Sequence, residues 1–366
     1  MENPAISEYD SLLQKFCDFS DKVSELPALH AAALRGDIPM VTALLAQNVG
    51  VNECGREYGT PLHAAAFNGN VRVAALLLDK GAEVDAPGKK YYGTPLQVAV
   101  SNGHRETIVL LLDKGADINP YGTEQACSPL HEAALNGGMD IVTLLLKRGA
   151  KVNATGEEND GTPLHAACLG GHDDIVELFL DHGADINAEQ GAYCTPLQAA
   201  VSQKEDALRL AKLLLGKGAD VNKQGGEAGS PLQAAVSYAN IDVVQLLVES
   251  GADVNASGGE YGSPLIAAAA DNSLSIAKLL LDNGAEINMQ SGSLNTALVG
   301  AVWHNHEEMV DYLLQEGANP DLQGGKLVDA RRLAAEKGNS TIIKHISRIK
   351  FETPVSSVNC CHNTIV

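Results

Sequence analysis

Four histidines recur at regular spacing in the first half of the chain and are the first candidates for chemistry. His30, His63, His131 and His165 each follow a leucine and are separated by 33, 68 and 34 residues. Imidazole side chains can ligate a metal ion or carry protons. A single ion needs ligand bonds of about 2 Å, whereas equivalent side chains of a repeating structure lie roughly 10 Å apart. We therefore predict that these histidines form no metal site.

A second group of chemically capable residues lies near the C-terminal end. Trp303, the one tryptophan of the chain, precedes His304 in a Trp-His-Asn-His run. His304 could act as a general acid or base. On a helix, His304 and His306 would face different ways, which argues against a metal site there. Together with Glu132 and Tyr238, His304 offers an alternative function: a pocket near Trp303 that binds a small molecule and catalyses an isomerisation or cyclisation.

Other signatures of chemistry are missing from the sequence. No glycine loop stands in the strand-to-helix context that a phosphate site needs, and no Ser–His or Cys–His constellation or zinc-ligand spacing is present. We therefore predict no cofactor.

The elements that position these residues follow from one repeated phrase, Gly-Thr-Pro-Leu-His-Ala-Ala, seen at residues 59–65 and 161–167. A second phrase, Gly-Ala-Asp-Val-Asn or a close variant, follows 19 residues after the motif leucine in most copies. Self-similarity at one period predicts a stack of repeating units. The residue after the motif leucine recurs every 33 to 35 positions, at His30, His63, Gln97, His131, His165, Gln198, Gln233, Ile266, Val299 and Arg332.

Each unit is predicted to be two short helices joined by a turn, so the fold class is all-α. Thr before Pro can cap the free amides of the first helix, and Pro fits its first turn. The second helix has apolar residues at i, i+1, i+4 and i+5, as in Ile141-Val142 with Leu145-Leu146. A glycine such as Gly149 then ends the helix in the left-handed conformation, and Asn48 takes its place in the first repeat. Turn-rich segments connect the units as hairpin-like loops.

These two phrases resemble those of the ankyrin-repeat family over roughly residues 26–350. The resemblance implies an ankyrin-repeat solenoid of about nine or ten helix–turn–helix repeats. It also implies that the motif histidine holds the turn through hydrogen bonds to the neighbouring backbone and Thr hydroxyl, with Gln as a substitute. The loop at residues 258–265, Gly-Gly-Glu-Tyr-Gly-Ser-Pro-Leu, resembles fungal ankyrin arrays in particular.

The ends of the chain depart from the repeat. Residues 1–25 are predicted to form an N-terminal capping segment, residues 26–350 the ankyrin-repeat array, and residues 351–366 a disordered tail. The tail contains Cys360-Cys361, for which palmitoylation is one alternative.

Charge and composition narrow the partners. The net charge is −20, from 26 basic and 46 acidic residues. This balance argues against nucleic acid and anionic membrane surfaces and favours a protein partner with a basic surface. We find neither a membrane-spanning apolar run nor a signal peptide, and the seven cysteines follow no disulfide framework. We expect a monomer in the cytoplasm or nucleus.

Residues that vary inside the repeating frame are the candidates for binding. We predict a non-catalytic scaffold or adaptor that recognises a protein through its concave groove and loop tips, because only variable positions are free to specify a partner. At the first helices these candidates are Phe67, Glu132, Leu135, Leu169, Tyr238, Trp303 and His304, and at the loop tips Arg56, Tyr58, Lys89, Lys90 and Tyr92.

Overall fold

The computed structural model describes residues 26–55, 59–88, 93–120, 127–155, 161–203, 205–226, 228–322 and 329–348. Within these ranges the secondary structure is helical, with isolated bridges at loop tips such as Gly55–Gly59 and Gly258–Gly262. These bridges confirm the hairpin-like loops, and the helices confirm the all-α class. The predicted capping segment at residues 1–25 and the tail at residues 351–366 lie outside the described residues.

Ten helix pairs follow one another along the described chain. The first helices of the pairs are α2 (Ala28–Arg35), α4 (Pro61–Phe67), α6 (Pro95–Ser101), α8 (Pro129–Leu135), α10 (Pro163–Leu169), α12 (Pro196–Val201), α14 (Pro231–Ser237), α16 (Pro264–Ala270), α18 (Ala297–Trp303) and α20 (Ala330–Lys337). The second helices are α3 (Ile38–Ala46), α5 (Val71–Asp79), α7 (Arg105–Asp113), α9 (Met139–Lys147), α11 (Asp173–Asp181), α13 (Ala207–Gly216), α15 (Ile241–Glu249), α17 (Leu274–Asp282), α19 (Glu307–Gln315) and α21 (Ser340–Arg348).

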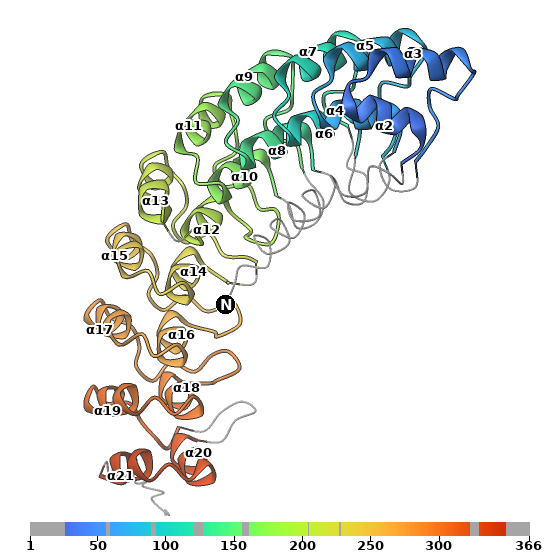
Figure 1. Cartoon of the computed structure of the whole chain (residues 1–366). Helices are drawn as coiled ribbons and strands as arrows, with labels where there is room; N and C mark the ends of the chain where they lie inside the picture. Colours follow the sequence, from blue (N-terminus) through green and yellow to red (C-terminus); the bar gives the residue numbers. More distant parts are fainter. Residues whose placement is uncertain are drawn as a thin grey trace, which may run out of the picture. The chain divides into compact units, whose positions relative to one another are not determined.

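The chain divides into two compact units, residues 1–199 and residues 200–366. In the first unit, α2, α4, α6, α8 and α10 form one row and their partners α3 to α11 form a second row (Figure 1). In the second unit, α14, α16, α18 and α20 form a row beside α15, α17, α19 and α21 (Figure 1). Within the first unit, for example, α4 contacts its partner α5 and the equivalent helices α2 and α6 of the neighbouring repeats, as expected of a stack.

Helix boundaries follow the predicted chemistry. Thr94 Oγ1 accepts a hydrogen bond from the backbone amide of Gln97, and Ser230 Oγ accepts one from the backbone amide of Gln233. In both helices a proline directly follows the capping residue. At the other end of the pair, Gly149 has φ +94° and Asn48 has φ +59°. A Cβ added to Gly149 would meet no atom within 4 Å, so glycine is favoured there by backbone conformation alone.

The core lies between the two rows. The first helices contribute alanines, such as Ala65 and Ala99, which are fully buried and let neighbouring helices approach closely. Ile141, Val142 and Leu145 are buried in α9, as predicted, but Leu146 is only half-buried. Leu146 lies at the rim of the apolar stripe, because i+5 is the position rotated farthest from i around the helix.

Candidate functional site

The motif histidines and glutamines form a structural ladder between repeats. His63 Nδ1 accepts a hydrogen bond from the Thr60 amide at 3.0 Å, and Nε2 lies 3.2 Å from the carbonyl oxygen of Gly93 in the next loop. A carbonyl can only accept, so Nε2 carries the proton. Gln97 makes the same pair of bonds: Oε1 accepts from the Thr94 amide at 2.7 Å, and Nε2 donates to the carbonyl oxygen of Cys127 at 2.7 Å.

Burial favours the neutral form of His63 and His165. Burial lowers the pKa of His63 and of His165 from 6.5 to about 4, while the bonds to the Gly93 and Cys194 carbonyls oppose that shift. His30 is also buried and its pKa is lowered by the same cause. Its helix α2 is preceded by Pro27, which has no amide hydrogen to offer to the ring. The bonding role implied by the family resemblance is thus observed, and the reach of Nε2 into the next repeat is an addition to it.

A second histidine ladder was not anticipated from the sequence. His104, His172 and His306 each precede a second helix, and each donates from Nε2 to a carbonyl of the preceding repeat. The acceptors are Phe67 and Leu135 for the first two, at 2.8 and 3.1 Å, and Ala270 for His306, at 2.9 Å. The recurrence of a polar residue just before most second helices, with Gly138 before α9 as an exception, was the available signal.

A ladder of asparagines runs along the Gly-Ala-Asp-Val-Asn turns. Asn153 shows the pattern: Nδ2 donates to the Gly183 carbonyl at 3.1 Å, and Oδ1 accepts from the Asp185 amide at 2.9 Å. Each such side chain therefore binds the backbone of the next repeat twice. These asparagines occupy the last position of the Gly-Ala-Asp-Val-Asn motif, but the motif alone does not predict their bonds to the next repeat. Equivalent asparagines are Asn52, Asn119, Asn222, Asn255 and Asn288.

The remaining candidates gather at what we call the first-helix edge. We define it as the last residue of each first helix, the turn that follows, and the first residue of the second helix. In the first unit, Phe67, Leu135 and Leu169 end α4, α8 and α10 and are half-buried. Glu132 lies inside α8, one turn before Leu135, and is also half-buried. These side chains keep part of their apolar surface available at the edge.

In the second unit the same edge exposes larger apolar side chains. Tyr238 follows the last residue of α14 and is 39% exposed, Ile241 opens α15 and is 41% exposed, and Trp303 ends α18 and is 42% exposed. Among the described residues, the only other exposed large apolar side chain is that of Met40 on α3. Tyr238, Ile241 and Trp303 all lie at the first-helix edge of the second unit.

The Trp303 ring contacts a lysine side chain of the same chain. Lys337, the last residue of α20, places Nζ 4.7 Å from the centroid of the Trp303 ring. An ammonium over an indole face at this distance is a cation–π contact. Trp303 thus contacts the last repeat while its ring stays partly exposed.

The neighbouring histidines differ from the expectation. The rings of His304 and His306 stack, with centroids 5.7 Å apart and planes 11° from parallel, so the prediction that they face different ways is wrong. That prediction assumed a helix, but His304 follows the last residue of α18 and His306 precedes α19. Asn305 between them has φ +60°, a left-handed turn that brings both rings to one side.

Asp271 gives this part of the edge an acidic centre. It follows α16, between the repeats of Tyr238 and Trp303. Burial raises the pKa of Asp271 above its ordinary value, His304 and His306 act in the opposite direction, and Glu260 raises it further. Asp271 and Glu260 in turn raise the pKa of Tyr261, after the larger effect of burial. At the second-unit edge, Asp271 thus lies on the repeat between those of Tyr238 and Trp303.

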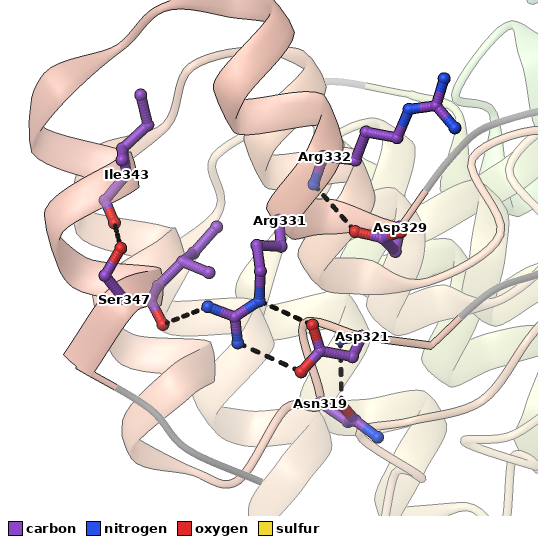
Figure 2. Close-up of polar contacts among 8 residues, drawn as sticks. Asn319, Asp321, Asp329, Arg331, Arg332, Ile343 and Ser347 are labelled. Atoms are coloured by element: carbon purple, nitrogen blue, oxygen red, sulfur yellow. Dashed lines mark hydrogen bonds and ion pairs between the residues drawn. The ribbon is translucent and has the colours of Figure 1, made fainter. Parts of the chain in front are cut away.

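The last repeat, which supplies Lys337, is fastened by Arg331. Its Nε and Nη2 bind both carboxylate oxygens of Asp321 at 2.6 and 3.1 Å, and Nη1 donates to the carbonyl of Ile346 at 3.2 Å. Figure 2 shows Arg331 facing Asp321, with Arg332 turned away and its amide bound by Asp329. The guanidinium holds the pKa of Asp321 below its ordinary value. One side chain thus joins α20, α21 and the preceding loop.

Several predicted site residues cannot be placed together. Glu132 belongs to the first unit, whereas Tyr238 and His304 belong to the second and lie two repeats apart. In the described ranges no group of three or more His, Cys, Asp or Glu side chains has metal-binding geometry. The described helices are also all too short or too polar to span a bilayer. The loop-tip candidates Arg56, Tyr58, Lys89, Lys90 and Tyr92 lie outside the described residues.

Comparisons with known proteins agree with this architecture. The family described as ankyrin repeats (3 copies) matches at residues 6–88, 29–122, 87–156, 130–225, 190–258 and 232–324. The ankyrin repeat domain of human ASB11 is 29% identical, with a TM-score of 0.53 over 61% of this chain and 97% of that domain. Alpha-latrocrustotoxin-Lt1a of Latrodectus tredecimguttatus is 38% identical over 84 residues, which are 23% of this chain and only 6% of the toxin.

These matches are to a human protein and a spider toxin, so they lend no support to the resemblance to fungal arrays. Ankyrin repeats generally serve as protein–protein interaction modules. The family match covers most of the chain, and the helix pairs, the capped first helices and the interrepeat ladders have the form that such repeats require. The chain therefore belongs to the ankyrin-repeat family.

Proposed function

We propose that this protein is a non-catalytic scaffold that binds a protein partner through its first-helix edge, the face that the sequence analysis assigns to the concave groove. The observation that carries the proposal is the exposure of Tyr238, Ile241 and Trp303 at this edge of the second unit. Large aromatic and aliphatic side chains at a surface are the usual anchors of protein interfaces.

The partner's surface is basic in this proposal. The chain has a net charge of −20, and Asp271, near Glu260, lies on the repeat between those of Tyr238 and Trp303. Complementary charge speeds encounter and selects against acidic partners. We further propose that the predicted loop tips extend the interface, that the protein acts as a monomer, and that it works in the cytoplasm or nucleus.

The small-molecule alternative has weaker support. A small-molecule site usually encloses most of its ligand. Tyr238, Trp303 and His304 are instead exposed at the described surface and come from two separate repeats. Asp271 beside His304 could exchange a proton, but neither group is enclosed. We therefore favour a protein partner.

The test compares what the protein captures from an extract of its native cells before and after the edge is altered. The edge variant carries Trp303→Ala and Tyr238→Ala. The matched control carries Tyr312→Ala, because Tyr312 is an aromatic residue of the same unit on a second helix, α19. Captured proteins and metabolites are both identified.

We expect the edge variant to lose specific proteins that the wild type and the Tyr312 variant retain, with unchanged circular dichroism. Equal capture by all three proteins would refute binding at this edge. Loss of a bound metabolite alone would favour the small-molecule function instead.

A further inference from the structure

The second-unit edge presents three features in register along successive repeats. Tyr238 and Ile241 form an apolar surface in one repeat, Asp271 supplies a carboxylate in the next, and Trp303 presents an aromatic face in the third. Neighbouring helices in such a stack lie about 8–10 Å apart, so the apolar surface and Trp303 are roughly 16–20 Å apart. An extended peptide covers that span with about five or six residues.

Lys337 shows what the Trp303 ring accepts. Its ammonium lies 4.7 Å from the ring centroid, although the same side chain is exposed and has water as an alternative environment. The ring is itself 42% exposed, so the contact is reversible and open to solvent. A lysine at the end of a helix can leave by rotating its own side chain, without any backbone change.

The charges around the ring also favour a cation. Asp271 interacts electrostatically with His304 and His306, which follow Trp303 in the chain, and with Glu260 on the loop before α16. On the last repeat, Arg332 is paired with Glu336 at 3.1 Å, whereas Lys337 reaches the ring. An incoming basic side chain would thus meet an aromatic face at Trp303 and an acidic residue, Asp271, on the preceding repeat.

From these features, and resting on the proposed function, we propose that the Trp303 ring recognises a lysine or arginine of an extended partner segment, in competition with Lys337. In the free protein the Lys337 ammonium occupies the face of the ring that the partner's basic side chain would contact. An apolar residue of the same segment, about six positions from the basic one, contacts Tyr238 and Ile241. Specificity then comes from two anchors at a fixed separation.

The experiment uses the full-length protein and synthetic peptides. The probe peptide has leucine and arginine about six positions apart in a Gly/Ser background, made in both orders, because the direction of the segment is open. One control peptide replaces arginine by glutamine, and another places leucine and arginine side by side. Trp303 is the chain's one tryptophan, so its fluorescence reports directly on the ring.

The decisive variant is Lys337→Gln, matched by Lys344→Gln. Both remove one positive charge from the last repeat, but Lys344 lies on the second helix α21. We expect Lys337→Gln to bind the probe two- to fivefold more tightly, which corresponds to about 0.5–1 kcal/mol for an exposed cation–π contact. Lys344→Gln should bind as the wild type does. Trp303→Ala, followed with a fluorescent label on the peptide, should weaken binding roughly tenfold.

Three outcomes would overturn the proposal. The first is equal affinity of the Lys337 and Lys344 variants for the probe. The second is a glutamine peptide or an adjacent-residue peptide that binds as well as the probe. The third is that neither order of the probe peptide shows saturable binding. If the edge variant still loses specific proteins in the capture experiment, the proposed function stands and only this recognition mode fails.

Discussion

Replacing two buried histidines by glutamine should make the first unit resistant to mild acid. His63 and His165 have a pKa of about 4 in the folded protein, against 6.5 when exposed. Between these values the unfolded chain binds more protons than the folded chain, so acidification favours unfolding. The contribution of each neutral histidine is present above pH 6.5 and is lost as the pH falls toward 4.

The magnitude follows from linkage. At about pH 5 each histidine is expected to cost ~2 kcal/mol of folding free energy relative to neutral pH, so the pair costs ~4 kcal/mol. Glutamine at these sites removes the titration and keeps the bonds, as Gln97 does in the third repeat with the Thr94 amide and the Cys127 carbonyl. The double variant His63→Gln, His165→Gln should therefore lose ~4 kcal/mol less than the wild type on the same pH change.

Urea unfolding followed by far-UV circular dichroism, at neutral pH and at about pH 5, gives the two differences in free energy. Hydrogen exchange of segments 59–67 and 161–169 locates the effect in the first unit. His182→Gln is the matched control, because His182 is exposed on the turn after α11. Equal acid sensitivity of the double variant and the wild type would refute the reasoning, and so would protection by the His182 variant.

Three further outcomes are expected. In urea titrations, Gly149→Val should lower the free energy of unfolding by about 1–3 kcal/mol more than Gly149→Asn does. The left-handed backbone is the one obstacle to a side chain at this position, and Asn48 adopts that conformation natively. Equal losses for the two variants would contradict this reasoning. Arg331→Met should cost about 1 kcal/mol, since the pair with Asp321 is partly exposed, and should speed hydrogen exchange across residues 330–348, whereas Arg332→Met should not. Excess EDTA should leave the melting temperature unchanged, and a drop would show that a metal stabilises the fold.

The repeating fold could be predicted from the sequence because its determinants are local. Thr94 and Pro95 start a helix, Gly149 ends one, and the spacing between such signals is constant. What could not be predicted was how each polar side chain uses the next repeat. The bond from Asn153 to Gly183 joins residues 30 apart, and it forms only once two units are stacked.

The candidate site was predicted in part. Trp303 and Tyr238 were singled out because they vary inside a regular frame, and both are exposed as expected. Lys337 gave no comparable signal, because its contact with Trp303 depends on how the tenth helix pair packs on the ninth. The stacking of His304 on His306 was missed for a local reason, the positive φ of Asn305, which no repeat-wide pattern specifies.

The ladder bonds that join one repeat to the next end on main-chain atoms. His63, Gln97 and Asn153 each reach a backbone carbonyl of the following unit, which every residue type provides. A neighbour can therefore change its side chains without breaking these bonds. Gene duplication or deletion of whole repeats preserves the same bonds, so an array of this kind can change length through recombination while its surface diverges freely toward new partners.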